Sequence, residues 1–361
     1  MAIENDVERL IDLLRNAESA SEVKRCEQLL RGLIARSGSP VIRAEIAHFF
    51  AEASDAPSLT GDWNNWKPTD TLVRLSEASS FYHTKKKFAI DARLAYRMIV
   101  SGESILDPLN PNREVEVFGT NSVLKMPAYR DEPLAIDPVK NIRRTKLIEI
   151  DVPGSGKILP RRVVVHKAGK NAGDRVLYVH DGAQTIEVGK FVNILDNLYH
   201  TEPKLPRCAV VFVSPVQRDQ EYMLNEDFTK YFAKTLVPFV EAKLKIAPKY
   251  RGTSGSSLGG LLSAHIGMRY PRVFTRITMQ SPALWVAKGK MIREYALAKK
   301  LSLDFYLHTG RINDAQADSR TFLRVLQEKG YAVRYHETNE SHNWGTWRGS
   351  YADIVRWFVA T

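Results

Sequence analysis

The fold is decided by one stretch of the sequence, which reads Arg251-Gly252-Thr253-Ser254-Gly255-Ser256-Ser257-Leu258-Gly259-Gly260-Leu261. At its centre, residues 255–259 have the pattern of a nucleophile elbow, a strained turn between a strand and a helix that lifts a serine hydroxyl above a sheet. Glycines two residues before and after the serine leave room where a Cβ would clash with the neighbouring strand or helix. The apolar run that follows predicts a helix that ends before Pro271, with the free N–H groups of its first turn near Ser257. We therefore take Ser257 as the candidate nucleophile, with an ordinary Gly/Ser-rich turn as the alternative reading.

On both sides of this stretch the sequence alternates between apolar strand patterns and helical patterns, from about residue 145 to the end at 361. An opening antiparallel pair is expected at 146–152 and 161–166. Buried strands are expected at 175–180, 208–213, 276–280, 303–308 and 331–337, and helices at 191–199, 228–243, 318–329 and 351–359. Alternation of this kind predicts an α/β domain, a mostly parallel sheet covered by helices on both faces.

A serine hydroxyl is a weak nucleophile at neutral pH, so it needs a general base that a carboxylate orients. In α/β-hydrolases the order along the chain is serine, acid, histidine, each on a loop after a strand. Asp314 follows the strand that ends near residue 308, and His342 follows the last strand. We predict Asp314 as the acid and His342 as the base. Asp314 could instead cap a helix, which would leave Asp318 or Glu340 as the acid.

The expected site also needs donors for the oxyanion, and the roles of the remaining histidines have to be considered. His180, His265 and His308 are as consistent with core or supporting positions as with chemistry. The loop at residues 180–183 is expected to supply one backbone donor for the oxyanion, from Gly182 or Ala183, and the N–H of Leu258 is expected to supply the other. This chemistry requires no metal and no cofactor.

The N-terminal part of the sequence has a different character. Residues 1–40 read as a helical segment with apolar faces that could serve packing or oligomer contact. Residues 41–128 carry short strand patterns separated by turn residues, beginning with a strand expected at 41–50, and they predict a small immunoglobulin-like β-sandwich. Residues 129–144 read as a linker into the catalytic domain at 145–361.

Motifs along most of the chain resemble the esterase family that includes enterochelin esterases and esterase D-like enzymes. The resemblance rests on residues 176–182, 218–222, 255–260, 280–285 and 342–348, and on a sandwich similar to modules that precede catalytic domains in enterochelin esterases and glycogen-branching and debranching enzymes. It implies an α/β-hydrolase fold for the catalytic domain, with a triad of Ser257, Asp314 and His342. It also implies that Arg218, Glu221, Trp285 and Arg348 line or support the substrate pocket. A structural alternative is that Arg218 and Glu221 simply pair with each other.

Trp63 and Trp66 are among the residues that carry the resemblance of the sandwich. Some modules of that type stack sugars on tryptophan, but the favoured interpretation here is that both residues brace the turn and the domain interface. Two other features depart from the family pattern. The lead-in at residues 251–254 is polar where the family usually has an apolar strand. Glu340-Ser341 precedes His342 where Gly-Gly is common.

The composition and charge of the chain limit its expected partners and location. The chain has 361 residues, a net charge of +11 and two cysteines, Cys26 and Cys208. Its basic residues are scattered, no apolar run approaches the length of a membrane span, and no signal segment is apparent. We expect no nucleic acid, no membrane and a cytoplasmic protein, with oligomerisation through the N-terminal helices or the sandwich as an option.

The predicted reaction is hydrolysis of a carboxylic ester. The resemblance implies a siderophore trilactone such as ferric enterochelin as the leading substrate, and the basic charge and the pocket arginines would suit an anionic ferric catecholate. The alternatives are a carbohydrate acetyl or feruloyl ester and, from a different class of function, an inert glycan-binding protein.

Overall fold

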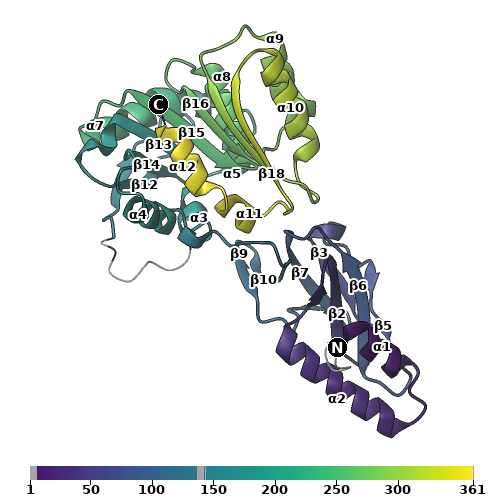
Figure 1. Ribbon diagram of the computed structural model, residues 1–361. Coiled ribbons are helices and arrows are strands. Elements are labelled where there is room, and N and C mark those ends of the chain that lie inside the picture. Colours follow the sequence, from purple (N-terminus) through teal and green to yellow (C-terminus); the bar gives the residue numbers. More distant parts are fainter. Residues whose placement is uncertain (1–5, 136–141, 143, 361) are drawn as a thin grey trace. The chain divides into compact units, whose positions relative to one another are not determined.

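The computed structural model describes residues 6–135, 142 and 144–360, and it divides into two compact units (Figure 1). Unit 1 contains residues 1–130 together with 339–341, and unit 2 contains residues 131–338 and 342–361. The part of the chain expected to be a linker, 129–144, lies partly outside the described residues, and its described portion includes a short 3₁₀ turn, Pro133–Ala135. Within the described residues, no helix combines the length and the hydropathy that spanning a bilayer requires.

Unit 1 begins with two helices, α1 (Val7–Arg15) and α2 (Ala20–Ser37). Asp6 caps α1, and Ser19 and Glu22 form a capping box at the start of α2, which explains where both helices begin. Their apolar faces share one buried cluster with the sandwich residues Val41, Phe50 and Phe81. The predicted helical segment therefore packs on the sandwich within the same unit.

The rest of unit 1 consists of two antiparallel sheets. One has the order β1-β2-β6-β5 and the other β4-β3-β7-β10-β9, with β8 beside β7. The strands are β1 (Val41–Arg43), β2 (Ile46–Glu52), β3 (Ser58–Gly61), β4 (Asp70–Thr71), β5 (Val73–Arg74), β6 (Phe81–Lys87), β7 (Arg93–Val100), β8 (Glu103–Ile105), β9 (Arg113–Glu116) and β10 (Gly119–Lys125).

The single strand predicted at residues 41–50 is wrong. The segment is a hairpin, in which Ala44 adopts a left-handed conformation (φ 53°) and Val41 pairs with His48. The alternation of apolar and polar residues continues through the turn, so the pattern alone does not reveal the break.

Trp63 and Trp66 have different surroundings. Trp63 lies against Phe49, Phe88 and Tyr96, and its indole N–H donates to the Asp70 carboxylate at 2.6 Å. Trp66 is 41% exposed. Trp63 therefore braces the sandwich, whereas Trp66 has an open face.

Unit 2 is built on an eight-stranded sheet of order β11-β12-β14-β13-β15-β16-β17-β18 (Figure 1). Read in this order across the sheet, the strands from β14 to β18 run parallel to one another. At the other edge, β12 pairs antiparallel with both β11 and β14. Their bounds are β11 (Ile148–Val152), β12 (Arg161–Lys167), β13 (Arg175–His180), β14 (Ala209–Val213), β15 (Tyr250–Ser256), β16 (Arg276–Gln280), β17 (Asp304–Gly310) and β18 (Ala332–Thr338).

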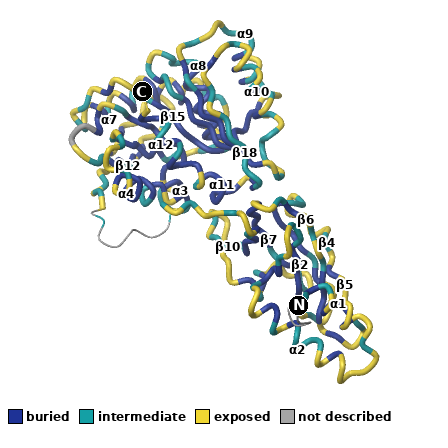
Figure 2. Tube along the Cα trace, in the orientation of Figure 1, coloured by how far each residue is buried: buried dark blue, intermediate teal, exposed yellow. Residues whose placement is uncertain are grey.

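Helices cover both faces of this sheet, so its central strands are buried on both sides (Figure 2). Side chains alternate between the faces along each strand: in β13, Tyr178 joins one buried cluster and Leu177 the other. The first face carries α6 (Glu226–Tyr231), a π-helical turn (Phe232–Leu236), α7 (Val237–Leu244), α8 (Leu258–Arg269), α9 (Val286–Leu297) and α10 (Gln316–Glu328), and the second carries α4 (Phe191–Thr201), α11 (Trp344–Arg348) and α12 (Tyr351–Val359).

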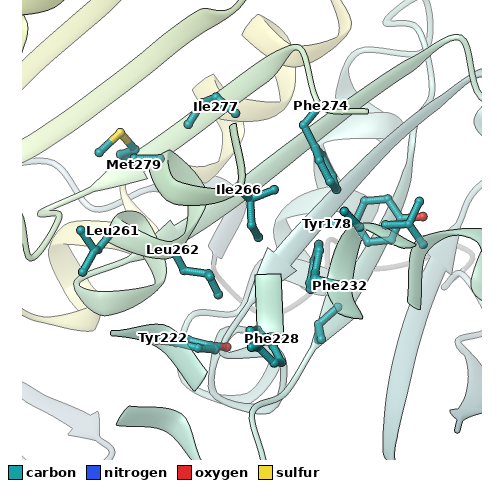
Figure 3. Close-up of a cluster of buried hydrophobic side chains, with 14 of the residues drawn as sticks. Tyr178, Tyr222, Phe228, Phe232, Leu261, Leu262, Ile266, Phe274, Ile277 and Met279 are labelled. Atoms are coloured by element: carbon teal, nitrogen blue, oxygen red, sulfur yellow. The ribbon is translucent and has the colours of Figure 1, made fainter. Parts of the chain in front are cut away.

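Aromatic rings fill the core under α8. Phe232, Phe274 and Tyr178 contact one another edge-on or tilted, beside Leu262 and Ile266 of α8 (Figure 3). This packing holds α8 against the sheet and thereby fixes the turn at its N-terminus. The mixed α/β architecture with a β-rich N-terminal unit confirms the coarse fold prediction.

Candidate active site

Ser257 lies in the turn between β15 and α8, with φ 56° and ψ −120°. A non-glycine residue is strained in this region, and such strain is concentrated at functional sites. Gly255 makes the turn possible, because a Cβ there would come within 2.5 Å of the Gly259 carbonyl carbon. The polar residues before the serine form a true central strand: β15 pairs with β13 and β16, and Gly252 lies against the Phe358 ring.

Three residues far apart in the sequence meet at the carboxyl ends of the parallel strands. His342 Nε2 lies 3.0 Å from Ser257 Oγ, and His342 Nδ1 lies 2.6 Å from Asp314 Oδ1. Asp314 is not a helix cap, since α10 begins at Gln316 with Ala315 at its cap position. Neither Asp318 nor Glu340 takes the place of Asp314 at His342.

The second oxygen of Asp314 is held by three donors. Ser281 Oγ and the Gly310 N–H each donate to Oδ2 at 2.6 Å, and Thr309 Oγ1 lies 3.3 Å away. Burial by itself raises the pKa of Asp314, but the hydrogen bond and charge of His342, together with these donors, hold it below its ordinary value. The carboxylate is thus kept ionised and pointed at His342.

Ser281 and Trp347 form a further layer of support that sequence reasoning did not single out. The Trp347 indole N–H donates to Ser281 Oγ at 3.0 Å, and the Trp347 ring meets the His342 ring edge-on with centroids 5.0 Å apart. Ser281 is fully buried with φ 42°. The signal was present, because both residues belong to motifs that carry the family resemblance, but spacing alone did not connect them.

The two predicted oxyanion segments begin helices. Leu258 is the first residue of α8, and Gly182 is the first residue of α3 (Gly182–Glu187), after Asp181 in a left-handed conformation. First-turn N–H groups have no partner within their own helix, which leaves them available to a ligand. The Ala183 N–H already donates to Ser214 Oγ at 3.0 Å. A Cβ on Gly182 would come within 2.7 Å of the Phe212 carbonyl carbon, so β14 packs closely against this turn.

Arg218 and Glu221 do not pair with each other. Arg218 forms a two-pronged ion pair with Asp181 at 2.7 and 2.8 Å, which anchors the residue before α3. Glu221 is buried and pairs with Arg161 at 2.8 and 3.0 Å. The structure therefore brings Arg218 to Asp181, in the loop predicted to supply an oxyanion donor, and leaves the Glu221 carboxylate engaged in the protein interior.

Arg348 and Trp285, the other two predicted pocket residues, have different surroundings. Arg348 donates to the Val188 carbonyl at 3.2 Å. Trp285 is 63% exposed and lines a cavity of about 370 Å³ beside His342. The residues that line this cavity are Ser281, Ala283, Trp285, Asn313, Asp314, Ala315, Ala317, Asp318 and His342.

The remaining histidines of interest are buried and hydrogen-bonded away from Ser257. His180 contacts Thr253 Oγ1 at 2.8 Å, His265 contacts Glu226 at 3.1 Å, and His308 contacts Thr338 Oγ1 at 3.3 Å. Across the described ranges, no three His, Cys, Asp or Glu side chains are grouped so that they could hold a metal ion.

The chain is similar to known proteins in sequence. Residues 159–358 match the model of the family described as "Putative esterase". Over 133 residues the chain is 25% identical to the uncharacterized protein YbbA of Bacillus subtilis, a match that covers 32% of this chain and about half (52%) of that protein.

Solved structures show the same fold over a longer span. The enterobactin esterase FES from Shigella flexneri, solved in the presence of enterobactin, covers 87% of this chain and 92% of its own, with a TM-score of 0.72 and 17% identity. The ferric enterobactin esterase from Salmonella typhimurium gives a TM-score of 0.72, 17% identity and coverage of 87% and 93%. A ferulic acid esterase gives a TM-score of 0.53 and 14% identity, and it covers 60% of this chain and 98% of its own.

Family and fold together define a carboxylic ester hydrolase. The family match extends over more than half of the residues and includes Ser257, Asp314 and His342. The chain belongs to the esterase family that this model describes.

Proposed function

We propose that this chain is a serine esterase of the α/β-hydrolase type, with Ser257 as nucleophile, His342 as general base and Asp314 as the acid that orients it. The observation that carries the proposal is the continuous contact from Ser257 Oγ through both nitrogens of His342 to Asp314, at 3.0 and 2.6 Å. Distances of this size allow proton transfer between the hydroxyl and the imidazole.

In this mechanism Ser257 Oγ attacks the ester carbonyl carbon while its proton passes to His342 Nε2. The imidazolium that forms is stabilised by Asp314, which remains ionised. His342 then donates the same proton to the departing alkoxide, and the bond between the carbonyl carbon and the alcohol oxygen breaks. A water molecule, deprotonated by His342, hydrolyses the acyl-enzyme and restores Ser257.

The negative charge on the carbonyl oxygen is held by backbone N–H groups at two helix N-termini, those of Leu258 and Gly182. Gly182 is preferred over Ala183 because the Ala183 N–H is already engaged with Ser214. Donors of this kind stabilise charge that develops only in the transition state, and loss of one typically costs about 100- to 1000-fold in rate.

Two substrate classes have support. A siderophore trilactone is supported by the fold likeness to enterobactin esterases, which spans 87% of the chain. A carbohydrate ester is supported by the open indole of Trp285 in the cavity beside His342, because exposed tryptophans stack on sugar rings. Comparing kcat/KM for enterobactin with kcat/KM for acetylated and feruloylated sugars decides between them.

The experiment that tests the reaction itself is hydrolysis of p-nitrophenyl acetate by the purified protein and by a Ser257→Ala variant. We expect turnover by the parent chain and a loss of about a millionfold in kcat for the variant. The glycan-binding alternative predicts no turnover by either protein. A Ser257→Ala variant that keeps the parent's rate would falsify the assignment of the nucleophile.

A further inference from the structure

The cavity that Trp285 lines lies beside His342, the residue that protonates the leaving alkoxide in the proposed mechanism. Its lining includes His342, Asp314 and Ser281 but does not include Ser257, Leu258 or Gly182, which bond to or stabilise the acyl carbonyl. His342 must hand its proton to the leaving alkoxide, so the alcohol portion of the ester has to lie next to His342. The cavity, at about 370 Å³, is within the size range of small-molecule sites.

Two lining side chains, Trp285 and Asp318, take no part in the proton transfers described above and are free to contact the alcohol. Trp285, at the start of α9, presents a 63% exposed indole. Asp318, in the first turn of α10, is partly buried. Asp314 is already occupied by four groups, whereas no hydrogen bond or ion pair of Asp318 is found in the part of the chain that the structure describes.

The charge of this cavity is unlike that of the whole protein. The chain carries a net charge of +11, yet no lysine or arginine is among the cavity's described lining residues. The arginines of the neighbouring segments are engaged: Arg311 and Arg320 both pair with Glu337, at 3.0 and 2.6 Å. An anionic alcohol placed here would face Asp318 without a compensating cation, which is unfavourable.

From these observations we propose that the cavity is the subsite for the alcohol portion of the ester, and that it selects an uncharged ring bearing free hydroxyl groups. The ring stacks on Trp285, and a hydroxyl donates to the Asp318 carboxylate. The inference rests on the proposed function and deepens it by naming the class of alcohol. A sugar and an iron-free catechol share this chemistry, whereas a metal-bound catecholate has no hydroxyl proton to donate.

A simple structural role for Asp318 has to be separated from this one. Asp318 occupies the first turn of α10, where a carboxylate interacts favourably with the N-terminus of the helix. That role would affect stability, and it would reduce activity toward every ester by the same factor. A role in recognition instead affects only alcohols that can donate to the carboxylate.

The test uses acetate esters, so that the acyl group is constant, and compares each variant with the parent chain on each ester, so that intrinsic reactivity cancels. The matched aromatic pair is 2-hydroxyphenyl acetate and 2-methoxyphenyl acetate, which differ in the donor hydroxyl. A 6-O-acetylated methyl glucoside forms the sugar arm, and 2-carboxyphenyl acetate forms the anionic arm. The variants are Asp318→Asn and Trp285→Ala, with Asp12→Asn, an exposed carboxylate of α1, as the charge control.

We expect Asp318→Asn to lower kcat/KM roughly tenfold for the hydroxylated esters, about twofold or less for 2-methoxyphenyl acetate, and to raise it for 2-carboxyphenyl acetate. Trp285→Ala is expected to lower kcat/KM by a larger factor for the ring alcohols than for ethyl acetate, which has no ring to stack on the indole. A loss of kcat/KM in Asp318→Asn that is seen only with the glucoside identifies the ring as a sugar. A loss that is seen only with 2-hydroxyphenyl acetate identifies it as a phenol. A uniform change across all esters, or none, overturns the proposal.

Failure of the subsite and failure of the proposed function are distinguishable. A fluorophosphonate probe reports on Ser257 without occupying the alcohol subsite specifically. Parent and Asp318→Asn proteins that label equally but show no discrimination among the esters refute the subsite alone. A parent chain that neither labels nor hydrolyses any ester refutes the function on which the subsite rests.

Discussion

Replacement of Ser281 by alanine tests whether the support behind Asp314 matters for catalysis. Ser281 touches neither Ser257 nor His342 in the hydrogen bonds described, and it acts through Asp314 Oδ2, to which it donates at 2.6 Å. Alanine keeps the Cβ and the left-handed backbone that this position already adopts, so the variant removes one oxygen and little else.

The size of the effect follows from what remains. Asp314 Oδ2 keeps the Gly310 N–H at 2.6 Å and the more distant Thr309 hydroxyl at 3.3 Å. A hydrogen bond to a charged acceptor contributes about 1.5–3 kcal/mol. Because the cavity can supply a water molecule in place of the lost hydroxyl, we take the lower part of this range, about 1.5–2 kcal/mol, which corresponds to roughly a 10- to 30-fold loss in kcat.

Three other variants give reference values for the loss in kcat expected of Ser281→Ala. Asp314→Asn, which favours the wrong tautomer of His342, is expected to lower kcat by about 10⁴-fold. Thr309→Val removes the longest of the three hydrogen bonds to Asp314 Oδ2 and should lower kcat threefold or less. Trp347→Phe leaves the hydrogen bond from Ser281 to Asp314 in place and should lower kcat by a similar factor. Each loss corresponds to roughly half a kcal/mol. Steady-state kinetics with p-nitrophenyl acetate, together with thermal unfolding, separate catalysis from stability.

The expected signature is a fall in kcat with little change in KM and little change in melting temperature. Trp347→Phe combined with Ser281→Ala should cost less than the sum of the two single changes, since the indole N–H acts on Asp314 through the Ser281 hydroxyl. A Ser281→Ala protein with kcat within twofold of the parent would show that Asp314 is held well enough without it, and our reasoning about this second layer would be refuted.

Three other changes have defined outcomes. Gly182→Ala places a Cβ within 2.7 Å of the β14 backbone and should displace the oxyanion donor, with a loss of about 100-fold in kcat by steady-state assay; a loss under threefold would remove Gly182 from that role. Glu221→Gln leaves the buried Arg161 guanidinium without a counter-charge and should lower the free energy of unfolding by about 3–5 kcal/mol in urea titrations; a raised KM at unchanged stability would instead restore Glu221 as a substrate-binding residue. Burial lowers the pKa of His308 to about 4 from 6.5, so the unfolded chain binds more protons between those values. Stability should therefore fall as pH drops from about 6.5 toward 4, by about 2 kcal/mol at pH 5 from this group, and His308→Gln should flatten the slope; an equal slope in both proteins would contradict the assignment.

The sequence predicts β13, β14, β16 and β17 of unit 2 well, because these central strands are buried on both faces and read as apolar runs between helical patterns. The closing helix at 351–359 matches the predicted bounds. The elbow was recognised in spite of its polar strand, because glycine and serine spacing reports on the crowded turn at Gly255 more directly than hydrophobicity does.

Unit 1 was less predictable. The segment 41–52 reads as one strand in the sequence but is a hairpin, since short strands in a sandwich are defined by their pairing, here of β2 with both β1 and the distant β6, and not by local pattern. A left-handed alanine at position 44 carries no sequence signature comparable to glycine.

At the site, order along the chain placed Ser257, Asp314 and His342, because each follows a parallel strand and the carboxyl ends of such strands share one edge. Charge partners could not be assigned in the same way. Arg218 and Glu221 are three residues apart and were read together, yet each pairs with a residue from another element, Asp181 and Arg161. Ion-pair choice depends on tertiary packing that spacing does not report.

The measurement that tests the central claim most directly is identification of the residue modified by a fluorophosphonate, by mass spectrometry of the digested protein. A nucleophile activated by the His342 imidazole at 3.0 Å is predicted to carry a single phosphonyl group on Ser257, at a rate that falls steeply in a His342→Ala variant. Modification at a different side chain, or an equal rate of labelling in the two proteins, would contradict the account.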